Sequence, residues 1–206
     1  SERSVYWTRS TRTPPCQPDG EPWGRTTVKN LRLWRLDGAK RTLVRSGDGA
    51  FEAADADAGR VAVVEPAGPV DVLAADGSIV HRFSFARGAA LGARLGGAQL
   101  VVLTATALEV DDAATGAAVK TIPLAPAPDR TLADFDGGIA VYIEGRTTHA
   151  VRVADGRSTT ISPRGTGAVF AQVEPAGLFT AWTLARGAQP GRVEFVSRSE
   201  LEQRLR

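Results

Sequence analysis

Sulfur-containing and imidazole side chains are scarce in this 206-residue chain, which has one cysteine, Cys16, and no methionine. A single cysteine cannot form a disulfide within the chain. Because the chain begins at Ser1 and carries neither methionine nor a signal peptide, we expect a processed, trimmed or partial polypeptide. The two histidines, His81 and His149, are predicted on the surface, and without a recognisable third ligand they cannot form a metal site.

Long apolar runs, catalytic motifs and a large excess of charge are also absent. No apolar run approaches the roughly 18 residues that cross a bilayer, so no membrane span is expected. No serine or cysteine lies in a recognisable nucleophile motif such as Gly-x-Ser-x-Gly. The formal net charge is only +2, which gives nucleic-acid binding no support. Hydrophobic residues make up 43% of the chain and charged residues 23%, so a folded domain rather than a disordered segment is expected.

The chain does have a turn that recurs at a nearly constant interval. Its four copies are Asp37-Gly38, Asp76-Gly77, Thr115-Gly116 and Asp155-Gly156, with glycines spaced 39, 39 and 40 residues apart. The Asp-Gly copies favour the positive φ of a tight type I′ hairpin turn between antiparallel strands. A period near 40 with strand-like sequence on both sides of each turn is typical of β-propeller blades.

The segments around each turn predict up to four strands per blade. Short apolar runs at 61–65, 100–104, 139–144 and 178–183 indicate second strands that are buried on both faces. Segments of small residues at 51–55, 90–95, 132–135 and 169–173 precede them and suit the crowded innermost strand. The sequence therefore predicts an all-β propeller of about five blade units, at about 1–48, 49–87, 88–127, 128–166 and 167–206.

The first and last units depart from this pattern. The first begins with a second-strand run at 5–8, has no inner strand ahead of it, and is interrupted by a Pro-rich loop insertion at 11–27. The last ends in 199–206, a polar segment predicted as a short helix with Ser199 as candidate N-cap, or as a fourth strand. Because an uncovered apolar edge invites aggregation, we expect the first blade to be completed by a missing upstream segment, as in a propeller with more blades, or by another polypeptide.

The repeat resembles that of the TolB-like and quinoprotein-like β-propellers. The similarity lies in the runs Val70 to Gly77 and Leu108 to Gly116, where a strand of that family's type leads into a glycine turn. It implies the propeller fold over nearly the whole chain from Phe51 onward, and says little about function because propellers have many unrelated activities. The family's usual Trp after the turn is replaced, so the resemblance does not extend to a quinone site. The matching strands carry Phe83, Ile122 and Ile161.

Two groups of residues are candidates for binding. Acidic residues near the ends of the inner strands would surround a propeller channel and could hold a cation such as calcium, or could simply make Asp-x-Gly turns. They are Asp55, Asp57, Asp134, Asp136 and Glu174. In the Pro-rich loop, Trp23 could contact a partner or a sugar, and Cys16 could pair with a cysteine of another chain if the protein is exported.

These observations leave three hypotheses about function. The first, which we prefer, is a non-enzymatic extracytoplasmic propeller that acts as a binding or interaction scaffold, without a cofactor. The second is an enzyme whose channel carboxylates act on a sugar-like ligand as a hydrolase or lyase. The third is a structural subunit of a multimeric or fibrous assembly.

Overall fold

The chain folds into five antiparallel β-sheets and one short helix over the residues that the structure, a computed structural model, describes: 5–12, 28–47, 52–57, 59–65, 68–127, 129–145, 147–161, 166–184 and 192–206. The first sheet contains β1 (Val5–Arg12), β2 (Val28–Asp37) and β3 (Lys40–Gly47). The second contains β4 (Glu52–Asp57), β5 (Arg60–Val64), β6 (Val70–Leu73) and β7 (Ile79–Phe83). The third contains β8 (Gly92–Gly96), β9 (Gln99–Leu103), β10 (Ala107–Asp112) and β11 (Ala118–Pro123). The fourth contains β12 (Arg130–Asp136), β13 (Ile139–Glu144), β14 (Thr147–Arg152) and β15 (Ser158–Thr160). The fifth contains β16 (Thr166–Glu174), β17 (Gly177–Leu184) and β18 (Arg192–Ser197), and the helix α1 (Arg198–Arg204) follows it.

Every sheet is a simple meander in which strands that follow each other in sequence are paired. The predicted all-β composition, the repeated antiparallel units and the approximate strand positions are therefore confirmed. Within the described residues, the first sheet begins with the counterpart of a second strand, and the fifth sheet ends after its third strand, both as the sequence indicated. The Pro-rich segment 13–27, with Cys16 and Trp23, lies outside the described residues.

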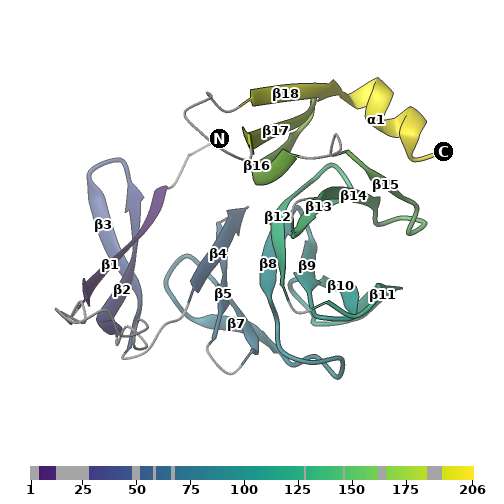
Figure 1. Cartoon of the computed structure of the whole chain (residues 1–206). Coiled ribbons are helices and arrows are strands. Elements are labelled where there is room, and N and C mark those ends of the chain that lie inside the picture. Colours follow the sequence, from purple (N-terminus) through teal and green to yellow (C-terminus); the bar gives the residue numbers. More distant parts are fainter. Residues whose placement is uncertain are drawn as a thin grey trace, which may run out of the picture.

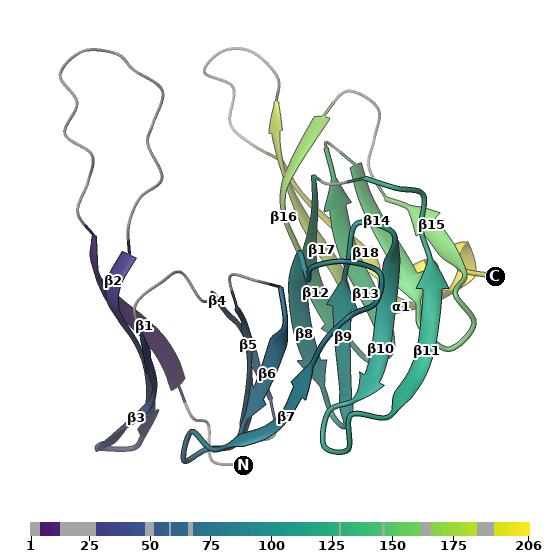
Figure 2. The same ribbon diagram turned by 90° about the horizontal axis from the view of Figure 1, so that it is seen from below.

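From the second sheet to the fifth, successive sheets pack face to face, and their first strands lie closest together. β4 contacts β8, β8 contacts β12, and β12 contacts β16. Figure 1 shows these four strands gathered side by side, while the later strands of each sheet fan away from them. In Figure 2, turned by 90°, strands of neighbouring sheets run in similar directions. The small residues predicted for the innermost strands fit this crowding.

The hydrophobic core is divided into four layers, one between each pair of neighbouring sheets. In the second, third and fourth sheets, the second strand contributes to two layers at once because side chains of a β-strand alternate between its faces. In β9, Leu100 and Val102 pack toward the second sheet, whereas Val101 and Leu103 pack toward the fourth. This arrangement explains why β5, β9 and β13 are continuously apolar and confirms that these second strands are buried on both faces. The prediction is wrong for the second strand of the fifth sheet, β17, where Phe179 is 39% exposed because only the opposite face of that strand joins a described core layer.

The repeat glycines have positive φ as predicted, but the predicted type I′ turn is wrong for Gly77. Its N–H donates to Ala74 O at 3.0 Å, so the glycine is the last residue of a four-residue turn. In the next two units the glycine N–H bonds four residues back, from Gly116 to Asp112 O and from Gly156 to Arg152 O. Among the four repeat turns, only the connection between Asp37 and Lys40 is a two-residue loop.

The helix α1 occupies the place where a fourth strand of the fifth sheet would follow. Ser197, rather than the predicted Ser199, is the N-cap, and its hydroxyl accepts from Glu200 N at 3.3 Å. Leu201 and Leu205 are buried in the core layer between the fourth and fifth sheets. The helix alternative of the sequence prediction is therefore confirmed. No helix of the described residues is long and apolar enough to cross a membrane.

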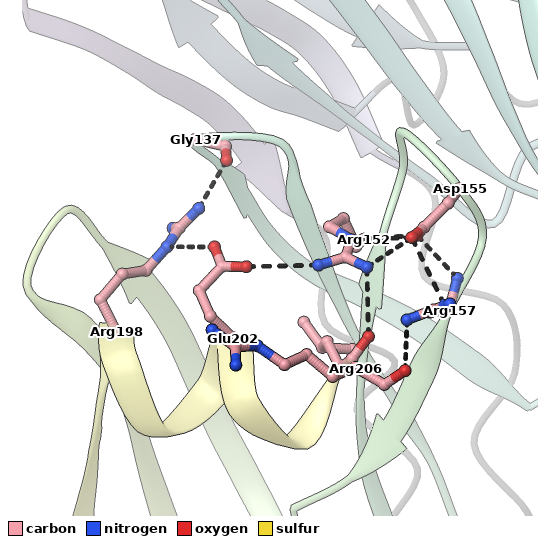
Figure 3. A network of polar contacts seen from close by, with 8 residues as sticks. Gly137, Arg152, Asp155, Arg157, Arg198, Glu202 and Arg206 are labelled. Carbon is pink, nitrogen blue, oxygen red and sulfur yellow. Dashed lines mark hydrogen bonds and ion pairs between the residues drawn. The ribbon is translucent and has the colours of Figure 1, made fainter.

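Polar contacts fix α1 to the fourth sheet, as Figure 3 shows. Arg198 donates to Gly137 O at 2.6 Å and to Glu202 at 3.0 Å. Arg152 of β14 contacts Glu202 at 3.5 Å, donates to Leu205 O at 3.2 Å and pairs with Asp155. Because all these groups have protein partners and join two elements of the core, we assign this network a structural role.

Candidate functional site

The inner-strand carboxylates singled out by the sequence connect neighbouring sheets. Asp57 at the end of β4 accepts a hydrogen bond from Gly97 N at 2.7 Å, 40 residues later. Asp134 of β12 accepts one from Val173 N of β16 at 2.8 Å, 39 residues later. Each bond spans about one repeat, so these carboxylates link the first strand of one sheet to the next sheet.

Of the other acidic candidates, the described side chains of Asp136 and Glu174 do not form a metal-binding group with these two. Asp136 ends β12, and Glu174 at the end of β16 accepts from the Gln172 amide at 2.6 Å. Asp55 lies on β4, and its side chain is outside the described part of the structure. Among the described residues, no three His, Cys, Asp or Glu side chains are placed to hold a metal ion. The calcium hypothesis therefore gains no support.

In the part of the chain that the structure describes, a cleft lies between the second and third sheets. One side of the cleft is formed by β7 and the segment that follows it, and the other side by β10 and β11. The volume of the cleft is about 430 Å³. A second hollow of about 220 Å³ shares Ser84 and Phe85 with it. The aromatic wall contains Phe83 and Phe85, stacked with centroids 6.4 Å apart, and His81, edge-on to Phe83 at 4.6 Å. A volume of this size suits a small ligand or one side chain of a partner.

Four charged residues line this cleft, two from each side. Arg82 of β7 donates two hydrogen bonds to the buried Asp71, from Nε to Oδ1 at 2.6 Å and from Nη2 to Oδ2 at 2.7 Å. Arg87 lies 3.6 Å from Glu109, which also accepts a hydrogen bond from Thr121. The fourth, Asp111 of β10, is only 8% exposed. It follows a β-bulge in the β10–β11 pairing, a feature that redirects side chains in strands.

The environment of Asp111 disfavours its ionised form. Burial, reinforced by the negative charge of Glu109 and partly offset by His81, raises the pKa of Asp111 to about 6. Its carboxyl group is therefore mostly ionised at neutral pH, and this ionisation lowers the free energy of unfolding of the protein. Perturbed carboxyl groups in clefts are candidates for functional sites.

The variant Asp111→Asn should stabilise the protein in a pH-dependent way. The folded-state pKa of about 6 lies above the unfolded value of 3.8, so the wild type loses stability as pH rises between them. We expect Asp111→Asn to gain about 1–2 kcal/mol in free energy of unfolding above about pH 6, less than the full shift implies because the cleft is open. The gain should vanish below the unfolded pKa.

Urea denaturation of both proteins across this pH range measures the difference. Taking the difference between the two proteins removes the contribution of Asp155, whose pKa Arg152 lowers, because both proteins share it. A constant difference in unfolding free energy from acid to neutral pH would contradict the prediction.

The sequence prediction missed this cleft and treated both histidines as surface residues. His81 and His149 are in fact only partly exposed. His149 stacks on Tyr142 at 4.8 Å, and burial lowers its pKa. A signal for the cleft was present in the repeat, because Asp111 is a carboxylate at a strand position that is apolar in the neighbouring units.

Comparisons with known proteins concern the fold alone. No family model matches this chain, and no curated protein matches its sequence. Among solved structures it is similar to the computationally designed protein Ika4, with 14% identity and a TM-score of 0.53 over 72% of this chain and 91% of Ika4. It is also similar to the computationally designed Ika8, with 12% identity and a TM-score of 0.58 over 83% of this chain. The match covers 54% of Ika8, so this chain spans about half of that protein's length.

Proposed function

We propose that this chain is a β-propeller-type scaffold that binds another polypeptide and catalyses no reaction. The observation that carries the proposal is an apolar face on the fifth sheet, which we call the aromatic face. Its residues are Phe170, Phe179, Val193 and Phe195. An extracytoplasmic location belongs to the same proposal and rests on the sequence resemblance to TolB-like and quinoprotein-like propellers.

The aromatic face follows from strand register. Phe179 pairs with Phe195 across β17–β18, and their rings lie 4.7 Å apart. Phe170 and Val193 both pair with Ala181 and so share this face. These four side chains are between 39% and 70% exposed. The opposite face of the same sheet contributes Ala171, Val173, Leu178 and Val196 to the core.

In the second, third and fourth sheets, both faces contribute to core layers with neighbouring sheets. An aromatic face of this kind is more often an interaction surface than a feature of an isolated monomer. We propose that a sheet of another polypeptide, or an upstream segment of a longer form of the protein, covers it and completes the ring with the first sheet. A structural subunit of an assembly would use the same face. The channel-enzyme alternative has no comparable support, because Asp57 and Asp134 accept backbone hydrogen bonds.

Removing the aromatic face should abolish self-association of the isolated chain. Without its natural partner, we expect the wild-type chain to associate with a second copy through this face, giving a mass above that of one chain in light scattering. The double variant Phe179→Ser/Phe195→Ser should have the single-chain mass and keep its fold, because both side chains point away from the core.

The control is Val119→Ser, which removes an apolar side chain that is 56% exposed on β11 of the third sheet. It should associate as the wild type does. A wild-type chain that stays a monodisperse monomer at all accessible concentrations would refute the proposal.

A further inference from the structure

Asp111 occupies a position of the repeat that is part of the apolar core in the neighbouring units. The units can be aligned by the residues that pair between the third and fourth strands of each sheet. In this alignment, Asp111 corresponds to Leu73 in the second sheet and to Val151 in the fourth. Both are fully buried and pack against the sheet that precedes their own. The third unit therefore replaces an apolar core residue by a carboxylate that faces the cleft.

This carboxylate has no hydrogen-bond donor among the described residues, unlike the other buried aspartate nearby. Asp71, which is fully buried, receives two hydrogen bonds from Arg82 and lies 3.3 Å from Arg45. The electrostatic influences on Asp111 come from Glu109, which repels its charge, and from His81. Buried polar groups in native proteins almost always have a partner, so an unpaired one that lines a cleft points to a ligand.

We propose that the cleft between β7 and β10–β11 binds a positively charged organic group, an ammonium or a guanidinium, on the Asp111 carboxylate. This site is separate from the aromatic face and does not depend on the proposed scaffold function. Its test also has a different readout, so either proposal can fail alone.

The surroundings of Asp111 suit such a cation. The cationic side chains that line the cleft, Arg82 and Arg87, are already paired with Asp71 and Glu109. Glu109 adds negative charge beside Asp111, and the rings of Phe83 and Phe85 provide faces that attract cations. The described cleft residues do not form a metal-binding group, which favours an organic cation over a metal ion.

Calorimetric titration of the purified chain can test this proposal. The probes are butylamine and Nα-acetyl-arginine amide as free cations, and a Gly-Gly-Arg-Gly-Gly peptide as a polypeptide-borne guanidinium. We expect saturable binding of at least one probe near neutral pH. Tighter binding of the peptide would identify a partner's side chain as the source of the cation, and tighter binding of the free compounds would identify a small molecule.

Asp111→Asn should weaken this binding at least about tenfold, because the amide has no charge. Asp129→Asn, with the same change in charge at an exposed position outside the cleft, should bind as the wild type does. Binding should also weaken at about pH 4.5, where Asp111 is protonated, and a His81→Gln variant should keep this dependence. Absence of saturable binding, or equal binding by the wild type and Asp111→Asn, would overturn the proposal.

Discussion

Val141→Asp is expected to leave the chain unfolded or aggregated. Val141 is fully buried on β13, in the core layer between the fourth and fifth sheets. An aspartate there would place a carboxylate among apolar side chains, which costs several kcal/mol. A domain of this size has only about 5–15 kcal/mol of net stability. Soluble yield and thermal unfolding followed by circular dichroism measure the effect.

The control for this prediction is Val119→Asp, on an exposed side of β11. Both changes put the same charge in place of a strand valine, but Val119 remains in contact with water. We expect its free energy of unfolding to change by no more than about 0.5 kcal/mol. A folded Val141→Asp protein with the wild-type melting temperature would show that the core layer does not lie on this side of β13.

The position of Val141 could be predicted because strand burial is encoded locally. A continuous apolar run of five or six residues predicts a strand that is buried on both faces, with a sheet on each side. The repeat interval then predicts the same order of strands in every unit. These two properties were sufficient to predict the order of strands and the burial of β5, β9 and β13, but not the exposed face of β17, because that face depends on whether another sheet lies beside it.

The lengths of the connecting turns could not be predicted in the same way. Asp37-Gly38 and Asp76-Gly77 are the same dipeptide, yet Gly38 begins a two-residue loop whereas Gly77 ends a longer turn. The difference depends on where strand pairing stops, which is set by bulges such as the one between Val72 and Leu73. The sequence of the turn alone does not determine that point.

The candidate site was partly predictable from the repeat and partly dependent on tertiary packing. Alignment of the units gives Asp111 the same position in the repeat as Leu73 and Val151, so a carboxylate in a core position was visible in the sequence. Its lack of a partner was not, because the facing groups come from β7, about 30 residues earlier. Likewise, the sequence placed Asp57 and Asp134 near the ends of inner strands, but their acceptor roles depend on neighbouring units.

Gly77→Ala is expected to destabilise the protein by about 3–4 kcal/mol, for two separate reasons. Gly77 has a φ of +88°, a conformation that costs a residue with a Cβ about 1–2 kcal/mol. In addition, an added Cβ would lie 2.3 Å from Val44 O, on the outermost strand of the first sheet. The atom in the way belongs to the backbone, which shifts at a greater cost than a flexible side chain. Urea denaturation measures the loss of unfolding free energy.

Gly38→Ala separates the conformational cost from the steric clash, because Gly38 has a positive φ but no close neighbour. Gly38 has a φ of +54°, but an added Cβ would meet nothing within 4 Å. Its expected cost is therefore the conformational part alone, about 1–2 kcal/mol. Gly116→Ala should fall between the two, because the atoms that its Cβ would meet belong to the His81 ring, which can rotate away at a smaller cost than backbone.

Equal losses for Gly77→Ala and Gly38→Ala would mean that the repeat glycines are required by turn conformation only. A larger loss at Gly77 would mean that the interval of about 39 residues also reflects the close packing of each turn against the sheet before it.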